Sequence, residues 1–240
     1  SRADRFFTSI AAENERARRV LERGGRLGLP HYEPLCELVT IIAPVRRVPV
    51  TGSERIDVDE LVAFLSTGTR QFHLSLEWSG GLFGDLERHG VVTQDVVVVR
   101  RQGTIVAAAA VWDQRAFRQT VIDSYEGAAL RPLINLALVM RRRPPLPAPG
   151  TVLAQAALLG ATVRDPGDWP DLWRQLLRHA TGRGLEWLTI SRDARDPELP
   201  VLRRLARGRE YRTILYDVTW PGGRTGVWDR RLFRPEVGLL

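Results

Sequence analysis

The stretch Leu185–Ser191, which reads LEWLTIS, is rich in aromatic and β-branched residues and predicts a β-strand. The polar residues Asp193–Asp196 end that pattern, and the apolar spacing of Leu199–Ala206 predicts a short helix that stops before Gly208. Another strand is predicted over Thr213–Trp220. Together these elements form a strand–helix–strand unit near the end of the chain.

A second stretch follows nearly the same plan near the start of the chain. Phe6–Ala12 predicts a strand, Arg16–Arg23 predicts a helix that Gly24 ends, and Leu38–Ile42 predicts another strand. A unit that occurs twice indicates a duplicated fold. The later unit has a full domain's length of chain in front of it, whereas the earlier unit has almost none. Two alternatives follow: the first domain is cut short, or this arm completes another part of the fold.

Between the two units the sequence predicts the remaining elements of a mixed α/β sheet with helices crossing it. Gln102 and Gly103 separate two β-rich runs and predict a tight hairpin. In chain order, helices are predicted at 57–65 and 70–78, strands at 93–101 and 104–112, a helix at 127–140, a strand at 151–162 and a helix at 170–179. We expect residues 1–50, 51–222 and 223–240 to form an N-terminal part, a main domain and a C-terminal tail.

The distribution of charge and the length of the apolar runs argue against two classes of partner. The 240 residues carry a formal net charge of +7, and all 35 basic residues are arginines. Nucleic-acid binders cluster their basic residues, whereas here arginines alternate with Asp and Glu, and the short run Arg141–Arg143 is interpreted as a solvated turn. No apolar run reaches membrane-spanning length. We therefore expect a cytoplasmic protein with neither a nucleic-acid nor a membrane partner.

Few side chains are suited to metal or thiol chemistry. Cys36 is the single cysteine, which excludes an internal disulfide and a multi-cysteine metal site, and we interpret it as a small buried apolar residue. The four histidines, His31, His73, His89 and His179, have no metal-ligand spacing. We therefore expect no metal site.

The order of the elements resembles that of the GNAT superfamily of acyl-coenzyme A-dependent N-acyltransferases over residues 52–220. The phrases Val111–Arg115 (VWDQR), Arg131–Asn135 (RPLIN) and Leu146–Gly150 (LPAPG) are similar to those of a bacterial branch with tandem GNAT domains. This resemblance implies a GNAT-like α/β fold. It also implies that Phe6–Pro44 is a partial β-α-β-β unit, the tail of a preceding GNAT-like domain, whose Asn14 matches the Asn of the family's Asn-x-x-Ala helix start.

The resemblance also places a site for the co-substrate, acetyl-coenzyme A or another acyl-coenzyme A. GNAT enzymes hold its diphosphate with a loop of the type Arg/Gln-x-x-Gly-x-Gly/Ala, which here corresponds to Arg164–Trp169 (RDPGDW). Arg164 and Gly167 match this pattern, and Trp169 departs from it. Acidic residues in and after this loop would repel a diphosphate, and Pro166 lacks an N–H donor. The predicted cofactor-binding residues are Ala161, Thr162, Val163, Arg164, Gly167, Asp168 and Trp169.

The catalytic residues are not identified by the resemblance. The predicted central strand carries no carboxylate to act as a base, and Leu199–Ala206 carries no tyrosine to act as an acid. Asp113, Tyr125 and Glu126 are the candidates, because they lie near predicted strand ends. The residues Trp78, Leu82 and Phe83 are candidates for the entrance of the amine substrate.

Two functions are open on these grounds. The first is transfer of an acetyl group from acetyl-coenzyme A to an amine, either a small molecule or a peptide. The alternative is a non-catalytic GNAT-like domain that acts as an acyl-coenzyme A sensor or as a dimerisation scaffold, because a fold does not establish an activity. We also predict a homodimer, because exposed strand edges favour pairing.

Overall fold

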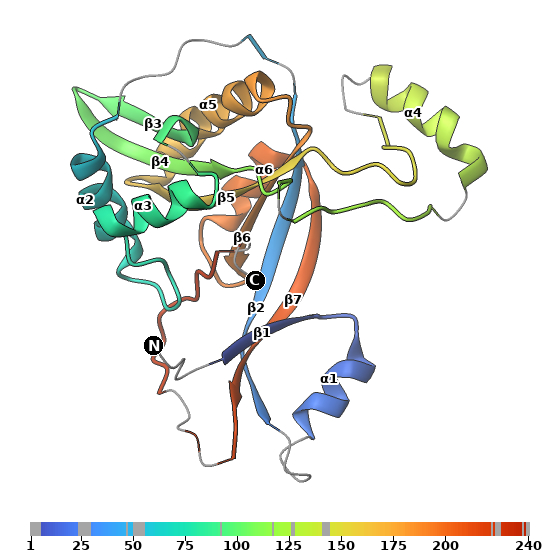
Figure 1. Ribbon diagram of the computed structural model, residues 1–240, viewed down its shortest axis with the longest axis horizontal. Coiled ribbons are helices and arrows are strands. Elements are labelled where there is room, and N and C mark those ends of the chain that lie inside the picture. Colours follow the sequence, from blue (N-terminus) through green and yellow to red (C-terminus); the bar gives the residue numbers. More distant parts are fainter. Residues whose placement is uncertain are drawn as a thin grey trace.

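The computed structural model describes residues 6–23, 30–46, 48–49, 56–91, 93–116, 118–125, 128–140, 145–221, 223, 227–236 and 238. They form one mixed sheet in the order β1-β7-β2-β6-β5-β4-β3 (Figure 1). Its strands are β1 (Phe6–Ala11), β2 (His31–Pro44), β3 (Val96–Arg101), β4 (Thr104–Trp112), β5 (Gln155–Val163), β6 (Trp187–Asp193) and β7 (Arg209–Thr219). Strands β5 and β6 are parallel, and the other neighbours are antiparallel.

Helices cover both faces of the sheet. They are α1 (Glu15–Glu22), α2 (Val58–Thr69), α3 (Gly80–Arg88), α4 (Arg131–Met140), α5 (Trp169–Gly182) and α6 (Leu199–Ala206). Alternate residues of β4 and β5 point to opposite faces, as a pleated strand requires. On one face Leu158 packs into a core with α5 and α6, and on the other Leu159 packs into a core with α2 and α3.

The two predicted strand–helix–strand units interlock in the sheet. Strand β7 of the later unit lies between β1 and β2, while β2 of the earlier unit lies between β7 and β6. The 14 residues of β2 pair antiparallel with both neighbours. Of the two alternatives for the arm, the described residues place it inside the sheet of the main domain. The boundary at residue 50 stays a prediction.

Local sequence signals explain most of the elements. The predicted hairpin is confirmed: Gln102 and Gly103 have φ angles of 52° and 79°, which are the two positive values of a type I′ turn. Asp57 caps α2 by accepting hydrogen bonds from Asp59 N and Glu60 N. In α1, Asn14 Oδ1 accepts from Ala17 N at 3.1 Å, which is the geometry expected of a helix start.

The helix predicted over residues 70–78 is wrong. This segment contains turns and a single bridge, and Leu74 has a φ of 56°. The helix α3 begins instead at Gly80, because the Ser79 hydroxyl caps it by accepting from Leu82 N at 3.1 Å. Gly80 and Gly81 therefore form the first turn of a helix.

Helix α4 lies away from the sheet, at the end of an arm between β4 and β5 (Figure 1). None of its residues is buried. Five of its large apolar residues are exposed, as is the preceding Leu130; these five are Leu133, Ile134, Leu136, Val139 and Met140. Large exposed apolar patches are typical of interaction surfaces.

Candidate functional site

Strands β5 and β6 separate after a short pairing, and this separation defines the candidate site. They pair at three positions only, from Gln155 with Trp187 to Ala157 with Thr189. Beyond those positions no described pair joins residues 158–163 to residues 190–193. We call the space between these two segments the β5–β6 gap.

A bulge in β5 points a backbone N–H into this gap. Ala108 pairs with Thr162 and Ala110 with Leu159, so that one residue of β4 opposes two residues of β5. Gly160 within the bulge has a φ of 58°, and a Cβ atom there would lie 2.2 Å from Trp78 Cζ2. Only glycine fits this position. Its N–H donates to Glu236 Oε1 at 2.8 Å.

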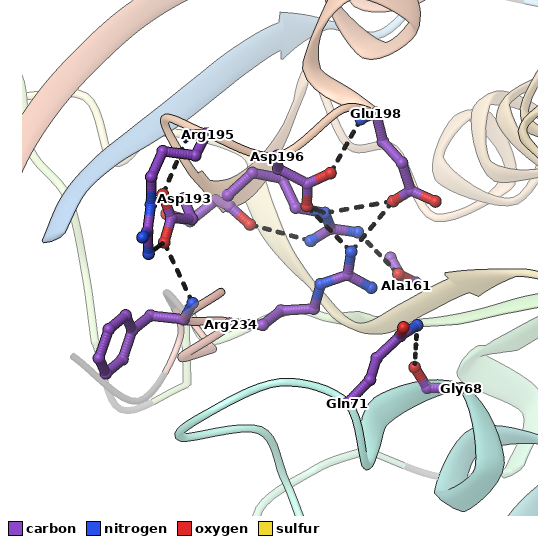
Figure 2. Close-up of polar contacts among 11 residues, drawn as sticks. Gly68, Gln71, Ala161, Asp193, Arg195, Asp196, Glu198 and Arg234 are labelled. Atoms are coloured by element: carbon purple, nitrogen blue, oxygen red, sulfur yellow. Dashed lines mark hydrogen bonds and ion pairs between the residues drawn. The ribbon is translucent and has the colours of Figure 1, made fainter. Parts of the chain in front are cut away.

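Buried charged side chains fill the β5–β6 gap (Figure 2). Arg192 on β6 reaches across it and donates from Nη2 to the Ala161 carbonyl at 2.6 Å. Arg234, from the C-terminal segment, donates to Asp196 Oδ2 at 2.9 Å and to Glu198 Oε2 at 3.1 Å. Each buried charge thus has an opposite charge or a polar partner, as burial requires.

The pKa values of two groups reflect this burial. Desolvation, together with the nearby Arg234 guanidinium, lowers the pKa of Arg192 to about 10, so the side chain remains a cation at neutral pH. Desolvation raises the pKa of Glu236, against the Gly160 hydrogen bond and the two arginines, which lower it. Buried ionic side chains therefore occupy the gap.

The loop Arg164–Trp169 follows β5, at the place where the resemblance puts the diphosphate. Its N–H groups are already bonded. Gly167 N donates to Asp165 Oδ1 at 2.7 Å, and Asp168 N donates to the Asp165 carbonyl at 2.9 Å. Asp165 N donates to Asp168 Oδ2, Trp169 N to the Pro166 carbonyl, and Arg164 N to the Val106 carbonyl.

These residues do not fit the diphosphate of coenzyme A. A diphosphate site needs free N–H donors and little negative charge. Here the two carboxylates of a capping box, Asp165 and Asp168, take those donors. Asp168 is also buried and pairs with Arg101 at 2.8 Å. The loop begins α5 by itself, without an anion.

Three of the predicted cofactor-binding residues line a cavity of about 460 Å³ between α2 and the ends of β4 and β5. They are Thr162, Val163 and Arg164. The Thr162 hydroxyl is buried and has no hydrogen-bond partner among the described residues. Phe64 and Gln71 of the α2 side form the opposite wall. Ala161, Gly167, Asp168 and Trp169 are not among the lining residues.

The catalytic candidates lie elsewhere. Asp113 follows Trp112, which pairs with Ala157 at the start of β5, so it lies at the opposite end of that strand from Arg164. Arg115 forms a bidentate ion pair with Asp113 and lowers the pKa of that carboxyl. The Tyr125 hydroxyl donates to the Pro147 carbonyl in the arm. Glu126 lies outside the described residues.

Other candidate residues take structural places. Trp78 and Phe83 are buried and pack on each other, with ring centroids 5.5 Å apart, while Leu82 is half-buried beside them. Cys36 is half-buried, and desolvation raises its pKa to about 12, so that its thiol stays protonated at neutral pH.

Gly160, Arg192, Arg234 and Glu236 were not among the predicted site residues. The first lies in a run of small residues, and the second lies in a segment interpreted as the end of a strand followed by polar residues. Arg234 and Glu236 belong to the tail, in the phrase Phe233–Glu236 (FRPE). The signal that could have identified them is an aromatic residue followed by an arginine and a glutamate within four residues of the tail.

The mixed sheet, its separated parallel pair and its crossing helices form a GNAT-like α/β fold. The chain is similar to a GCN5-related N-acetyltransferase from Sphaerobacter thermophilus, with a TM-score of 0.51 and 13% identity over 97% of this chain and 62% of that one. It is also similar to a GNAT-family protein from Novosphingobium aromaticivorans, with a TM-score of 0.46 and 17% identity over 90% of this chain and 75% of that one. For a GNAT-family protein from Colwellia psychrerythraea, the TM-score is 0.44 and the identity 15% over 90% of this chain and 65% of that one.

These likenesses are to the fold. The chain spans less than two thirds of the Sphaerobacter and Colwellia chains. No protein-family model matches the sequence, and no curated protein matches it. No helix in the described ranges is both long and apolar enough to cross a membrane. Within the same ranges, no group of three or more His, Cys, Asp or Glu side chains is placed to hold a metal ion.

Proposed function

We propose that this chain is a non-catalytic GNAT-like domain that serves as an association scaffold. One observation carries this proposal: the Glu236 carboxylate accepts the Gly160 N–H inside the β5–β6 gap, directly before Ala161, Thr162 and Val163, where the resemblance places the acyl donor. The capped loop Arg164–Trp169 supports the same conclusion, because each of its backbone N–H groups already has an acceptor within the protein. With the donor site closed, what the domain retains is its shape and its surfaces.

The scaffold part of the proposal rests on α4. This helix projects on an arm and exposes Leu133, Leu136 and Met140 by more than half of their surface. A second copy of the chain is the partner we propose, in keeping with the homodimer expected from the sequence. An acyl-coenzyme A sensor is less well supported, because the sensor and the enzyme need the same diphosphate loop.

Isothermal titration with acetyl-coenzyme A and with free coenzyme A tests the proposal. We expect no heat of binding for either ligand up to about 1 mM, where a specific site would be occupied. Saturable binding with a Kd in the micromolar range would overturn it. Coenzyme A is the control that separates recognition of the nucleotide part from recognition of the acetyl group.

The second candidate function is acyl-coenzyme A-dependent acetylation of a small-molecule or peptide amine. Two observations favour it: the bulge at Gly160, which provides an N–H donor, and the cavity beside Thr162. This function requires the C-terminal segment to leave the gap and the diphosphate to be held outside the loop Arg164–Trp169. Release of coenzyme A thiol in a mixture of acetyl-coenzyme A and polyamines or basic peptides would support it.

A further inference from the structure

The segment Phe233–Glu236 lies in the structure as a bound peptide does. It belongs to no helix and to no strand of the sheet, and its one bridge joins Phe233 to His73. Both backbone groups of His73 take part: His73 N donates to the Leu232 carbonyl at 2.8 Å, and the His73 carbonyl accepts from Arg234 N at 2.9 Å. Extended peptides that bind a protein surface use backbone hydrogen bonds of this kind.

Three side chains of this segment enter three separate environments. Phe233 packs against the rings of His73 and Trp228, whose centroids are 5.1 Å and 5.4 Å from its own. Arg234 lies over the ring of Phe72, 3.5 Å from its centroid, and its Nη2 pairs with acidic residues (Figure 2). Glu236 reaches the bulge of β5. All three are buried.

The groups that receive the segment are charge-complementary to it. Asp196 and Glu198, just after β6, face the Arg234 guanidinium. On the receiving side, the Gly160 N–H and the Arg192 guanidinium act on Glu236. In addition, Phe233 N donates to Asp193 Oδ2 at 3.1 Å, and Arg195 holds that carboxylate with a bidentate ion pair (Figure 2).

The receiving groups are therefore arranged for one short sequence. The residue pattern is an aromatic ring, then an arginine, then a glutamate two residues later, with Pro235 between the last two. Proline fixes its own φ, so the segment loses less entropy when it is held extended. Backbone bonds hold the segment in place, and the separate environments select its side chains.

We propose that the β5–β6 gap, with the adjoining His73 loop, is a peptide-binding groove whose resident ligand is the chain's own segment Phe233–Glu236. The groove is specific for an extended peptide of the pattern aromatic–Arg–Pro–Glu. This inference goes beyond the scaffold function and does not depend on it. Its test uses a peptide readout in which coenzyme A has no part.

The experiment uses the full chain with a protease recognition sequence inserted after Gly223. The protein is folded first and then cut, so that residues 224–240 are no longer covalently attached to the body. We expect the fragment to remain with the body in gel filtration at about 1 μM, which requires a Kd below that concentration. A labelled synthetic peptide of residues 227–240 should then replace the resident fragment, as followed by fluorescence anisotropy.

Matched peptides test the selectivity of the groove. Glu236→Ala and Arg234→Ala peptides are each expected to bind at least about tenfold more weakly, because a buried N–H or a buried carboxylate pair loses its partner. A Glu236→Gln peptide keeps an acceptor for the Gly160 N–H and should lose less. Equal binding by all four peptides would overturn the proposal, since the aromatic residues alone would then hold the segment.

Two further outcomes of the cut would also overturn it. If the body keeps its circular dichroism spectrum but releases the fragment and binds no peptide, the gap is not a groove. If the body unfolds on cutting, the segment is an inseparable part of the core. Amide hydrogen exchange of the uncut chain, without the inserted protease sequence, is an independent measurement. Glu236→Ala should increase the exchange rate of residues 228–236 severalfold and leave the exchange rate of β4 unchanged. An equal increase in both regions would contradict the proposal.

Discussion

Thr40 on β2 and Ser191 on β6 are paired on neighbouring strands, with their hydroxyl oxygens 3.2 Å apart, although their positions in the chain differ by 151 residues. This contact joins the two strand–helix–strand units that the sequence repeats. Since β2 pairs with β7 on its other side, the earlier unit fills the centre of the sheet formed by the later one. The stability of the domain should therefore depend on β2 as on any central strand.

Ile41 tests this dependence, because its side chain is 1% exposed on β2. Ile41→Ala is expected to lower the free energy of unfolding by about 2–5 kcal/mol, the range for a buried Ile cut back to Ala. Urea denaturation followed by circular dichroism measures the change. The control, Val20→Ala on the exposed side of α1, should change it by about 0.5 kcal/mol or less. A small loss for Ile41→Ala would mean that β2 pairs without contributing to a common core.

Gly160 provides a second test, of the bulge in β5. Gly160→Ala forces a side chain into a positive φ and onto Trp78, so we expect a loss of at least about 2 kcal/mol. Gly84→Ala is the matched control. A Cβ atom at Gly84 meets nothing within 4 Å, and the helix α3 should gain about 0.5–1 kcal/mol. Thermal unfolding of both variants measures these changes in stability. A Gly160→Ala variant as stable as the native chain would contradict the bulge geometry.

Much of the fold could be predicted because its signals are local. The Gln102-Gly103 turn, the Asp57 cap and the proline at the start of α5 each specify a short piece of backbone. The helix expected over residues 70–78 is absent, and the capping signal lies after that segment: the Ser79 side chain caps the next helix, and Gly80 and Gly81 form its first turn. A periodic pattern without a cap is a weak signal.

The site was harder to predict, because long-range contacts make it. Asp165 and Asp168 were expected to repel a diphosphate, but a sequence does not show that they also take the loop's own N–H groups. Glu236 and Gly160 meet only because the tail returns to β5, 76 residues back along the chain. The positive φ of Gly160, which makes its N–H available, has no signal in a run of alanines and leucines.

The loop Arg164–Trp169 gives a third prediction. Asp165→Ala removes the acceptor of the Gly167 N–H and should lower the free energy of unfolding by about 0.5–2 kcal/mol, as for other lost helix caps. Asp165→Asn is the matched control, because its amide oxygen is still an acceptor, and it should lose clearly less. Chemical denaturation of the two variants measures the difference. Equal losses would mean that the charge of Asp165, rather than its cap, stabilises the loop.

The raised pKa of Glu236 gives a prediction on pH. A carboxyl with a higher pKa in the folded state binds its proton more tightly there, so its contribution to stability is full below about pH 4.5 and is lost as the pH rises through the raised value. Glu236→Gln removes this dependence. The stability of the native chain minus that of Glu236→Gln should therefore fall as the pH rises above 4.5.

Two other carboxyls do not interfere in this window. The pKa of Asp193 lies below 3.8, because the Arg195 ion pair and the N–H donors outweigh its desolvation, and Arg231 lowers the pKa of Asp229 to about 2. Both lose their contributions only in more acidic solution. Urea midpoints of both proteins between pH 4.5 and 8 would measure the difference. A difference that grows with pH would show that Arg192 and Arg234 outweigh desolvation at Glu236.

The scaffold proposal makes a prediction at α4. The side chains of Leu133 and Leu136 are 66% and 60% exposed, so replacing both with Asp should change the free energy of unfolding by no more than about 0.5 kcal/mol each. The same change places charges on the proposed contact between two copies and should shift the protein to the monomer in sedimentation velocity. Val20→Asp, an equally exposed apolar position on α1, is the control and should leave association unchanged. Either of two results would contradict the proposal: a native chain that is monomeric at about 100 μM, or an α4 variant that still dimerises. A contact too weak to form a dimer at about 100 μM has a Kd above that concentration.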